Sequence, residues 1–486
     1  MQAGRRAAGA PSAATPPRPS SWTVLLRKHW LFSVLLLTGA GLRGLTVTAY
    51  QPVFLLQRDA YTYLHHAVRP DFVPSQFRPV AYSILFLKPL LLTESLLVIG
   101  IAQHVLILLL ALGLYAMMQR LTVPAVPAAI GTAPILLDGY QIAIEHYILT
   151  EAFFQALIVC ALLLLAWSVR PHVASTFLSG LLLGLATLTR FAGAVLVVIA
   201  VLFLLVRRVG WLRLVALVLA FALPVVGYSF WFRSWFGTTG VTNRNGFFLY
   251  GRVASFADCR AVEVPHELER FCFEEPPEQR GPNRGFFALE NLGGLAANPR
   301  ANGLLSDFSW RMIRGQPLEY ARVVLVDLMN YFEPRPPPQQ EPYVKRWRFP
   351  LALEDADPRP FVLRHRGSAP ARMGFQPFRI DSSMAARLRA YQDHVYTWGP
   401  LLAVLLLVGL GGATYGAVRR PLDRLAWVAA LFALSALGLL LFPVATTVYH
   451  FRYVIPILPL AGAGGALGAA AFLGARRHSG TPRNGQ

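Results

Sequence analysis

Long apolar runs separated by short polar segments dominate this chain of 486 residues. A membrane-spanning helix needs about 20 apolar residues. Residues Val173 to Val206 as one helix would be about 51 Å long, too long for a hydrocarbon core of about 30 Å, so we expect two short helices that meet at Arg190. The pattern predicts a polytopic α-helical membrane protein with about ten transmembrane helices, in the runs Trp30–Tyr50, Leu96–Met118, Val123–Leu137, Ile148–Ala166, Val173–Thr189, Phe191–Val206, Leu212–Phe232, Trp398–Ala417, Leu425–Val448 and Tyr453–Leu473.

One long polar segment, residues 233–398, interrupts this pattern. It is rich in proline and holds 18 of the 25 acidic residues of the chain. A segment of this length is large enough for a domain. A helical pattern runs from Ser309 to Phe332, and we expect it to break near Pro317 because proline disrupts a helix interior. We therefore predict a folded insert between the transmembrane helices.

Composition and charge position narrow the class of protein and its topology. Charged residues make up 14% of the chain, against about 25% in soluble proteins, which excludes a soluble enzyme, a disordered chain and a coiled coil. The net charge of +20 does not indicate nucleic-acid binding, because the basic residues outside the insert lie mainly in short loops and so specify membrane topology. With the N-terminus inside, the inner segments hold 16 basic residues and the short outer segments 6. Both termini are therefore expected on the cytoplasmic side, and the insert outside.

This topology divides the chain into five parts. They are a disordered cytoplasmic tail (1–21), an N-terminal transmembrane core (22–232) with a first outer loop (51–94) carrying interfacial helices, an exoplasmic insert domain (233–398), C-terminal transmembrane helices (399–474) and a cytoplasmic tail (475–486).

Only three of the 45 basic residues are lysine, a bias that reflects a GC-rich genome. We expect the cytoplasmic membrane of a bacterium. Cys259 and Cys272 in the insert would face an oxidising compartment, so a disulfide between them is favoured over two free thiols.

Charged side chains at the ends of apolar runs are the candidates for function, because a bilayer makes them costly. Each also has a plainer interpretation: a solvated loop carboxylate for Asp59, helix capping for Glu151, and interface anchoring for the arginines. His104 is expected to be a core histidine, and Arg43 to extend outward to the interface. The outer boundary collects Asp59, Arg78, Glu145, His146, Glu151, Arg190, His450 and Arg452.

The combination of these residues indicates chemistry on a lipid-linked phosphate. Arginine binds phosphate oxygens in pairs, and a carboxylate beside such arginines can serve as a base. No metal-type histidine spacing, nucleophile elbow or glycine-rich phosphate loop is present, and the spacing Asp355-Ala356-Asp357 is interpreted as a loop. No cofactor is therefore implied with certainty, and a divalent metal is without support.

Several short motifs resemble the membrane-embedded C-type glycosyltransferase superfamily, in particular enzymes dependent on a phospholipid carrier such as protein O-mannosyltransferases and aminoarabinose transferases. They are Asp59 in the first outer loop, Arg78-Pro79 with Tyr82, LTEAFF at the fourth span, GLLLGLATLTRFAG with Arg190, and RYVIPILPLAGA at the last span. The resemblance implies a sugar donor on a polyprenyl phosphate, an outer active site and Asp59 as catalytic acid or base. Many relatives have two tandem acidic residues in this loop. Here Ala60 follows Asp59, which speaks against a metal there.

The site residues follow from this resemblance and from the charges. Asp59 would take the proton of the acceptor hydroxyl, and attack opposite the phosphate would invert the anomeric carbon. The donor phosphate would bind Arg78, Arg190, His450 and Arg452, and the substrates would contact Tyr61, Tyr63, His66, Tyr82, Glu145, His146 and Glu151. The insert would select an acceptor, whether protein, lipid or glycan. The alternatives are a transporter or flippase of a lipid-linked sugar, for which internal repeats would be expected, and a non-catalytic membrane sensor.

Overall fold

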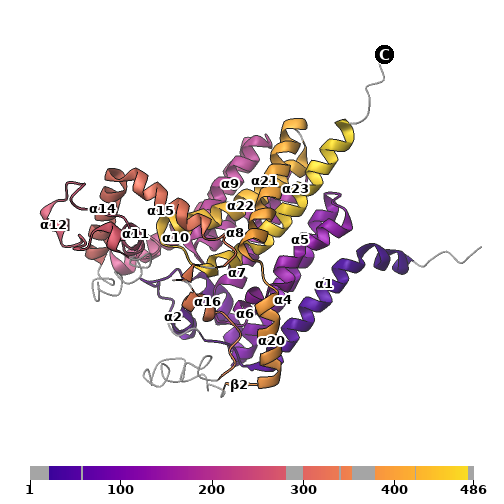
Figure 1. Ribbon diagram of the computed structural model, residues 1–486, viewed down its shortest axis with the longest axis horizontal. Coiled ribbons are helices and arrows are strands. Elements are labelled where there is room, and N and C mark those ends of the chain that lie inside the picture. The colour runs from indigo at the N-terminus through magenta and orange to yellow at the C-terminus, as the bar shows by residue number, and fades with distance from the viewer. Residues whose placement is uncertain are drawn as a thin grey trace, which may run out of the picture.

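The computed structural model describes residues 21–55, 59–280, 299–335, 337–338, 341–352, 378–421 and 423–479. Residues 1–20 and 480–486 of the predicted tails, and the Asp355–Asp357 motif, lie outside these ranges. The described chain is mostly helical. Its helices form one elongated bundle with a smaller lobe to one side (Figure 1).

Six helical segments are long and apolar enough to cross a membrane. They are α1 (Ser21–Ala49), α4 (Leu96–Arg120), α10 (Trp211–Phe236), α21 (Gly399–Arg419), α22 (Arg424–Thr446), and the 3-10 helix η7 (Phe451–Ile457) continued by α23 (Leu458–Ser479). Shorter apolar helices join them: α5 (Ala125–Leu137), α7 (Glu151–Ala166), α8 (Val173–Thr187), and the 3-10 helix η3 (Phe191–Gly193) with α9 (Ala194–Val206). These segments coincide with the ten predicted runs. The count of ten spans stays a prediction, because four of them are shorter than a full crossing.

Small residues let the central helices approach closely. α23 packs against α21, α22 and α5, and it is the most buried of the long helices. A Cβ atom on Gly412 of α21 would lie 2.0 Å from the carbonyl oxygen of Gly468 in α23. Side chains of any size are therefore excluded at this contact, as is common between helices in membranes.

The predicted break at Arg190 is present. α8 ends at Thr187, and Arg190 is extended, with φ −145° and ψ 125°, before η3 begins. The first loop holds helix α2 (Asp59–Val68), the π-helix η1 (Tyr82–Leu87), α3 (Lys88–Leu90) and the 3-10 helix η2 (Leu91–Thr93). Figure 1 places α2 with α6 (Gly139–Glu145) at the end of the bundle opposite the start of α1 and the end of α23. The break and the first loop thus supply irregular backbone on which charged side chains can gather.

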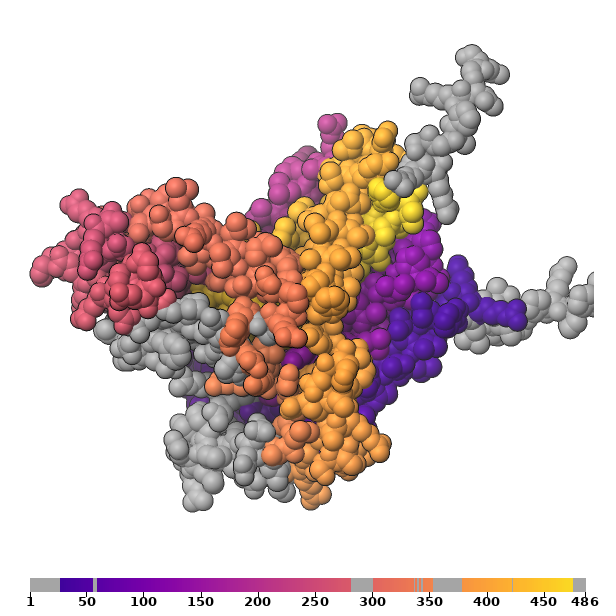
Figure 2. Space-filling model, viewed as in Figure 1, coloured from indigo at the N-terminus to yellow at the C-terminus, as the bar shows by residue number. Residues whose placement is uncertain are grey.

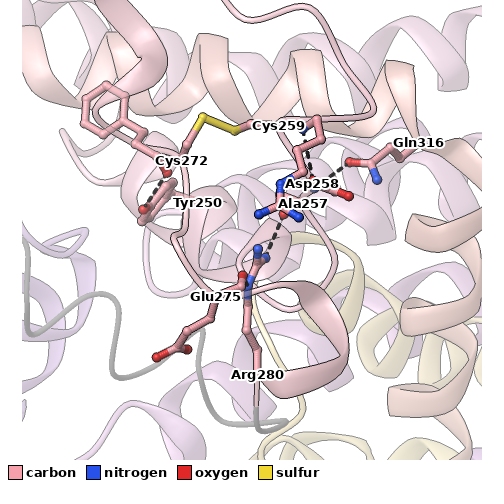
Figure 3. The surroundings of a disulfide bond; sticks show 10 residues. Tyr250, Ala257, Asp258, Cys259, Cys272, Glu275, Arg280 and Gln316 are labelled. Carbon is pink, nitrogen blue, oxygen red and sulfur yellow. Dashed lines mark hydrogen bonds between the residues drawn. A yellow bond between two sulfur atoms is a disulfide. The ribbon is translucent and has the colours of Figure 1, made fainter.

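The predicted insert has two differently packed parts. The first part is a lobe with its own core, formed by α11 (Asn245–Val253), α12 (His266–Glu269), the 3-10 helix η4 (Pro277–Gln279) and α14 (Pro299–Gly315). It projects from the bundle in Figure 2. A disulfide joins Cys259 to Cys272 there, with 6.0 Å between the Cα atoms. Around it Tyr250 donates to the carbonyl of Phe271, and Arg280 to that of Ala257 (Figure 3).

α15 (Pro317–Met329) begins after a break at Gln316, next to the predicted Pro317. It attaches the lobe to the bundle, because Asp327 pairs with buried Arg252 of α11, which also donates to the carbonyl of Val444 in α22. The second part of the insert rejoins the main core. It comprises α16 (Glu341–Lys345), strand β2 (Arg379–Ile380), which pairs antiparallel with β1 (Tyr50–Gln51), and α20 (Ser382–His394), which packs on α1 and α6.

Candidate active site

Asp59 is the first residue of α2, and each of its carboxylate oxygens meets a different arginine. Arg78 Nη2 lies 2.5 Å from Oδ1, and Arg452 Nη1 lies 3.1 Å from Oδ2. Arg78 comes from the loop before η1, and Arg452 from η7, which is 393 positions away in the chain. The structure therefore brings together three of the predicted site residues at the end of the bundle that carries the first loop.

Glu151 extends this set on its buried side. It opens α7, and its Oε1 atom lies 2.5 Å from Arg190 Nη1 and 2.8 Å from Arg452 Nε. The first contact is a hydrogen bond, and the second is an ion pair whose angle is not that of a hydrogen bond. Arg190 also lies 3.4 Å from the hydroxyl of Thr150. Five side chains thus form an alternating row of arginines and carboxylates, which we call the open cluster: Arg78, Asp59, Arg452, Glu151 and Arg190.

The open cluster carries an excess positive charge, because three guanidinium groups face two carboxylates. Burial raises the pKa of Asp59, but Arg78 and Arg452 outweigh it and hold that pKa below its usual value. The carboxylate is therefore ionised at neutral pH. Glu151 is the most buried member, with a side chain that is 1% exposed, and Arg78 is the most exposed at 35%, while Arg452, Asp59 and Arg190 lie between 11% and 14%. A ligand can thus reach the cluster from the Arg78 side.

Aromatic rings flank the arginines. The guanidinium carbon of Arg452 lies 5.2 Å from the ring centre of Trp347, and that of Arg190 lies 5.4 Å from the ring of Tyr453. Such contacts stabilise a cation while leaving its N–H edge available. Sequence reasoning missed both residues. Trp347 belongs to the insert, and its place beside Arg452 depends on the second part of the insert returning to the main core.

His450 binds backbone instead of presenting a charge. Its Nδ1 accepts the N–H of Arg452 at 3.1 Å and so caps η7. Burial, with the nearby Arg452 and Arg190, lowers the pKa of His450 to about 3. A neutral imidazole adds no positive charge to the cluster, and the contact of His450 with the donor phosphate stays a prediction. Its bond to the N–H of Arg452 fixes the backbone at the start of η7.

The aromatic residues of the first loop surround Asp59 in different ways. Tyr63 lies under Arg78, which donates to its hydroxyl at 3.4 Å, and its ring meets Tyr82 edge-on. Tyr82 is fully buried, and its hydroxyl donates to Gln103. This bond fixes the ring of Tyr82, which in turn packs against the inner side of Tyr63. Tyr61 and His66 remain partly exposed on α2. Burial lowers the pKa of His66 to about 4, which leaves it neutral at pH 7.

Glu145 and His146 do not join the open cluster. Both are buried with Arg43 and His104 in a second set, which we call the closed cluster. Arg43 Nη2 and Nε each lie 2.7 Å from a Glu145 oxygen, and His104 lies 2.8 Å from Glu145 and 3.2 Å from His146. A contact of these two residues with substrate has no support in this arrangement, because neighbouring protein groups already occupy their polar atoms.

The expectation that Arg43 extends to the interface is wrong. Its side chain is 2% exposed, and besides Glu145 it donates to the carbonyls of Gly39, Ile135 and Leu136. α5 ends at Leu137, so its last carbonyls lack helical donors. Arg43 supplies those donors from inside the bundle, and this removes its need for water.

Neither a scan against protein-family models nor a search of the curated proteins finds a match. Among solved structures, the chain is similar to the oligosaccharyltransferase of Archaeoglobus fulgidus in its apo form, with a TM-score of 0.42 and 14% identity over 92% of this chain and 51% of that one. It is also similar to the archaeal oligosaccharyltransferase AglB of A. fulgidus in complex with an inhibitory peptide and a dolichol-phosphate, with a TM-score of 0.41 and 15% identity over 95% of this chain and 53% of that one.

The present chain spans about half the length of these structures. At this level of similarity, its activity has to be inferred from its own residues.

Proposed function

We propose that this protein transfers a sugar from a polyprenyl-phosphate carrier to an acceptor hydroxyl at the exoplasmic face of a bacterial cytoplasmic membrane. The observation that carries the proposal is the open cluster, in which arginines from three separate segments surround two carboxylates, and the more exposed of these, Asp59, pairs with Arg78 and Arg452. Both chain termini would be cytoplasmic. The donor's lipid tail would lie in the bilayer, with its phosphate at the cluster.

The donor phosphate would compete with Asp59 for Arg452. A phosphodiester carries one negative charge, which matches the single excess positive charge of the open cluster. Carboxylate and phosphate oxygens accept the same charge-assisted hydrogen bonds from arginine. Without donor, Asp59 occupies the Nη1 edge of Arg452. We infer that donor binding frees this oxygen of Asp59 at the moment when the acceptor needs a base.

The transfer then balances as a single displacement. The acceptor hydroxyl gives its proton to Asp59, and its oxygen forms a bond to the anomeric carbon. The bond from that carbon to the phosphate oxygen breaks, and the electron pair leaves with the polyprenyl phosphate. The phosphate gains a negative charge, which Arg190 and Arg452 stabilise, as preorganised cations do in transition states. Attack opposite the leaving group inverts the anomeric carbon.

Residues on α2 would contact the acceptor. Tyr61 and His66 stay partly exposed, while Tyr63 and Tyr82 would position Arg78 and Asp59 from below. The lobe held by the Cys259–Cys272 disulfide would select the acceptor. No step of this scheme uses a metal or a nucleotide.

The test is to incubate purified protein with a panel of polyprenyl-phosphate sugars and candidate acceptors, and to detect release of polyprenyl phosphate by mass spectrometry. Wild-type protein should release the carrier with at least one sugar, and Asp59→Asn should release far less. A transporter or sensor would bind the lipid without breaking the sugar–phosphate bond. Binding without any release across the panel would contradict the proposal.

A further inference from the structure

Glu151 occupies an unusual place in the open cluster, because it is its most buried member and touches two of the three arginines. Its side chain is 1% exposed, at the first residue of α7. The segment that leads into α7 is fixed by backbone contacts, in which Phe54 donates to the carbonyl of His146 and Ile148 donates to that of Phe54. The Glu151 carboxylate is thus held in place from the backbone upward.

A single oxygen of Glu151 joins two arginines from different parts of the chain. Oε1 meets Arg190, which lies in the break between α8 and η3, and Arg452 on η7. Two guanidinium groups this close repel each other, and an intervening carboxylate converts that repulsion into attraction. Among the described residues, Glu151 is the one carboxylate within ion-pair distance of Arg190. Without it, Arg190 would keep only its ring contact with Tyr453 and its long contact with the Thr150 hydroxyl, and neither offsets the repulsion between the two guanidinium groups.

The two carboxylates of the cluster differ in what a ligand could displace. Asp59 lies on the open side and shares the Nη1 atom of Arg452, whereas Glu151 lies on the inner side at Nε. A phosphate arriving from the open side would meet Asp59 first. Glu151 would stay in place behind the two arginines.

We propose that Glu151 is a positioning residue of the donor-phosphate site, which holds Arg190 and Arg452 side by side so that both bind one phosphate group. The proposal rests on the function proposed above. Glu151 acts through the arginines and does not touch the donor.

The second oxygen of Glu151 defines the rival interpretation. Oε2 is buried and, among the described residues, has no hydrogen-bond partner. A buried acceptor is normally satisfied, either by an ordered water or by a hydroxyl of the substrate. If a sugar hydroxyl donates to Oε2, Glu151 is a sugar-binding residue. A positioning role affects binding of the donor phosphate, whereas a sugar-binding role affects binding of the donor sugar.

The test measures the affinity of wild type, Glu151→Gln and Glu151→Asp in detergent for two probes: a polyprenyl-phosphate sugar that the wild type accepts, and polyprenyl phosphate without sugar. Positioning predicts that Glu151→Gln weakens both probes by the same factor, about 10-fold or more for the loss of a charged partner. Glu151→Asp, which keeps the charge, should retain more affinity than Glu151→Gln. Asp71→Asn, which removes the partner of Arg69 on the protein surface, is the matched control and should bind as wild type.

A double-mutant cycle with Arg190→Ala gives the second readout. If Glu151 acts through the arginines, adding Glu151→Gln to Arg190→Ala should weaken polyprenyl-phosphate binding far less than it does in wild type, since residues in one network are not additive. A loss confined to the sugar-bearing probe, or full additivity in the cycle, would overturn the positioning role. Failure of wild type to bind either probe would instead overturn the proposed function and this proposal with it. If Glu151→Gln does not fold, the same two comparisons are made with Glu151→Asp.

Discussion

The open and closed clusters are both built from arginines and carboxylates, but the closed cluster stabilises the fold and the open cluster can bind a ligand. In the closed cluster one arginine, Arg43, meets one carboxylate and three backbone carbonyls, and both charged side chains are almost wholly buried. In the open cluster three arginines share two carboxylates, and exposure rises toward Arg78. A saturated ion pair leaves no donor for a ligand. An excess of arginine at an accessible edge can bind an anion.

This difference separates structure from function better than residue type does. Glu145, Glu151 and Asp59 all lie near the ends of apolar runs, and their positions along the chain do not separate a structural carboxylate from a functional one. Their partners distinguish them. Glu145 has an arginine to itself, whereas Asp59 and Glu151 share one arginine, Arg452, through different nitrogen atoms.

The largest expected effect comes from breaking the closed cluster. Glu145→Gln would leave Arg43 charged, buried and without its partner, which typically costs about 3–5 kcal/mol. Thermal unfolding in detergent should show this loss, while the folded fraction should bind donor normally. Replacing both members, as Arg43→Met with Glu145→Gln, should be less harmful than Glu145→Gln alone. If the folded fraction of Glu145→Gln also lost donor affinity, the closed cluster would be part of the binding site and the distinction between the two clusters would be wrong.

Loss of arginines from the open cluster should act on binding instead of folding. Arg190→Ala and Arg452→Ala should each weaken donor affinity by about 1.5–3 kcal/mol, the range of a charge-assisted hydrogen bond. Titration with the donor lipid measures it. Arg120→Ala is the control, because Arg120 is exposed and donates to a backbone carbonyl, that of Trp167. Unchanged affinity in both variants would leave these arginines as interface anchors.

The smallest effect is on pH dependence. The pKa of Asp59 is lowered, so the base of the free enzyme stays ionised down to acidic pH. The fall of kcat/KM with acid should therefore begin below about pH 4, the usual pKa of an aspartate. With donor bound, the phosphate replaces Asp59 at Arg452, so the pKa of Asp59 should rise. The acid limb of kcat should then lie higher, by on the order of one pH unit. Coincident limbs would show that the donor does not displace Asp59.

The sequence predicted those features of the structure that depend on a single segment of the chain. Apolar run length located the main helices, and the excessive length of Val173–Val206 predicted the break at Arg190. Charges at run ends identified Asp59, Arg78, Arg190 and Arg452, because the bilayer restricts where such side chains can lie.

What the sequence could not predict depends on contacts between distant segments. Nothing near Arg43 indicates that it pairs with Glu145, 102 positions away. Strand β2 is two residues long and pairs with β1 across more than 300 positions, too short for a periodic pattern. The position of Trp347 over Arg452 depends on that same return of the insert to the core.

The most direct test of the central claim is the chemical rate of Asp59→Asn, measured in single turnovers with saturating donor. Asparagine keeps the shape and removes the proton acceptor, so the rate should fall by about 10²-fold or more, equal to about 3 kcal/mol or more. Donor should bind at least as tightly as in wild type, because the competing carboxylate for Arg452 is gone. A near-normal rate in folded Asp59→Asn protein would remove Asp59 from the chemistry and contradict the glycosyltransferase account.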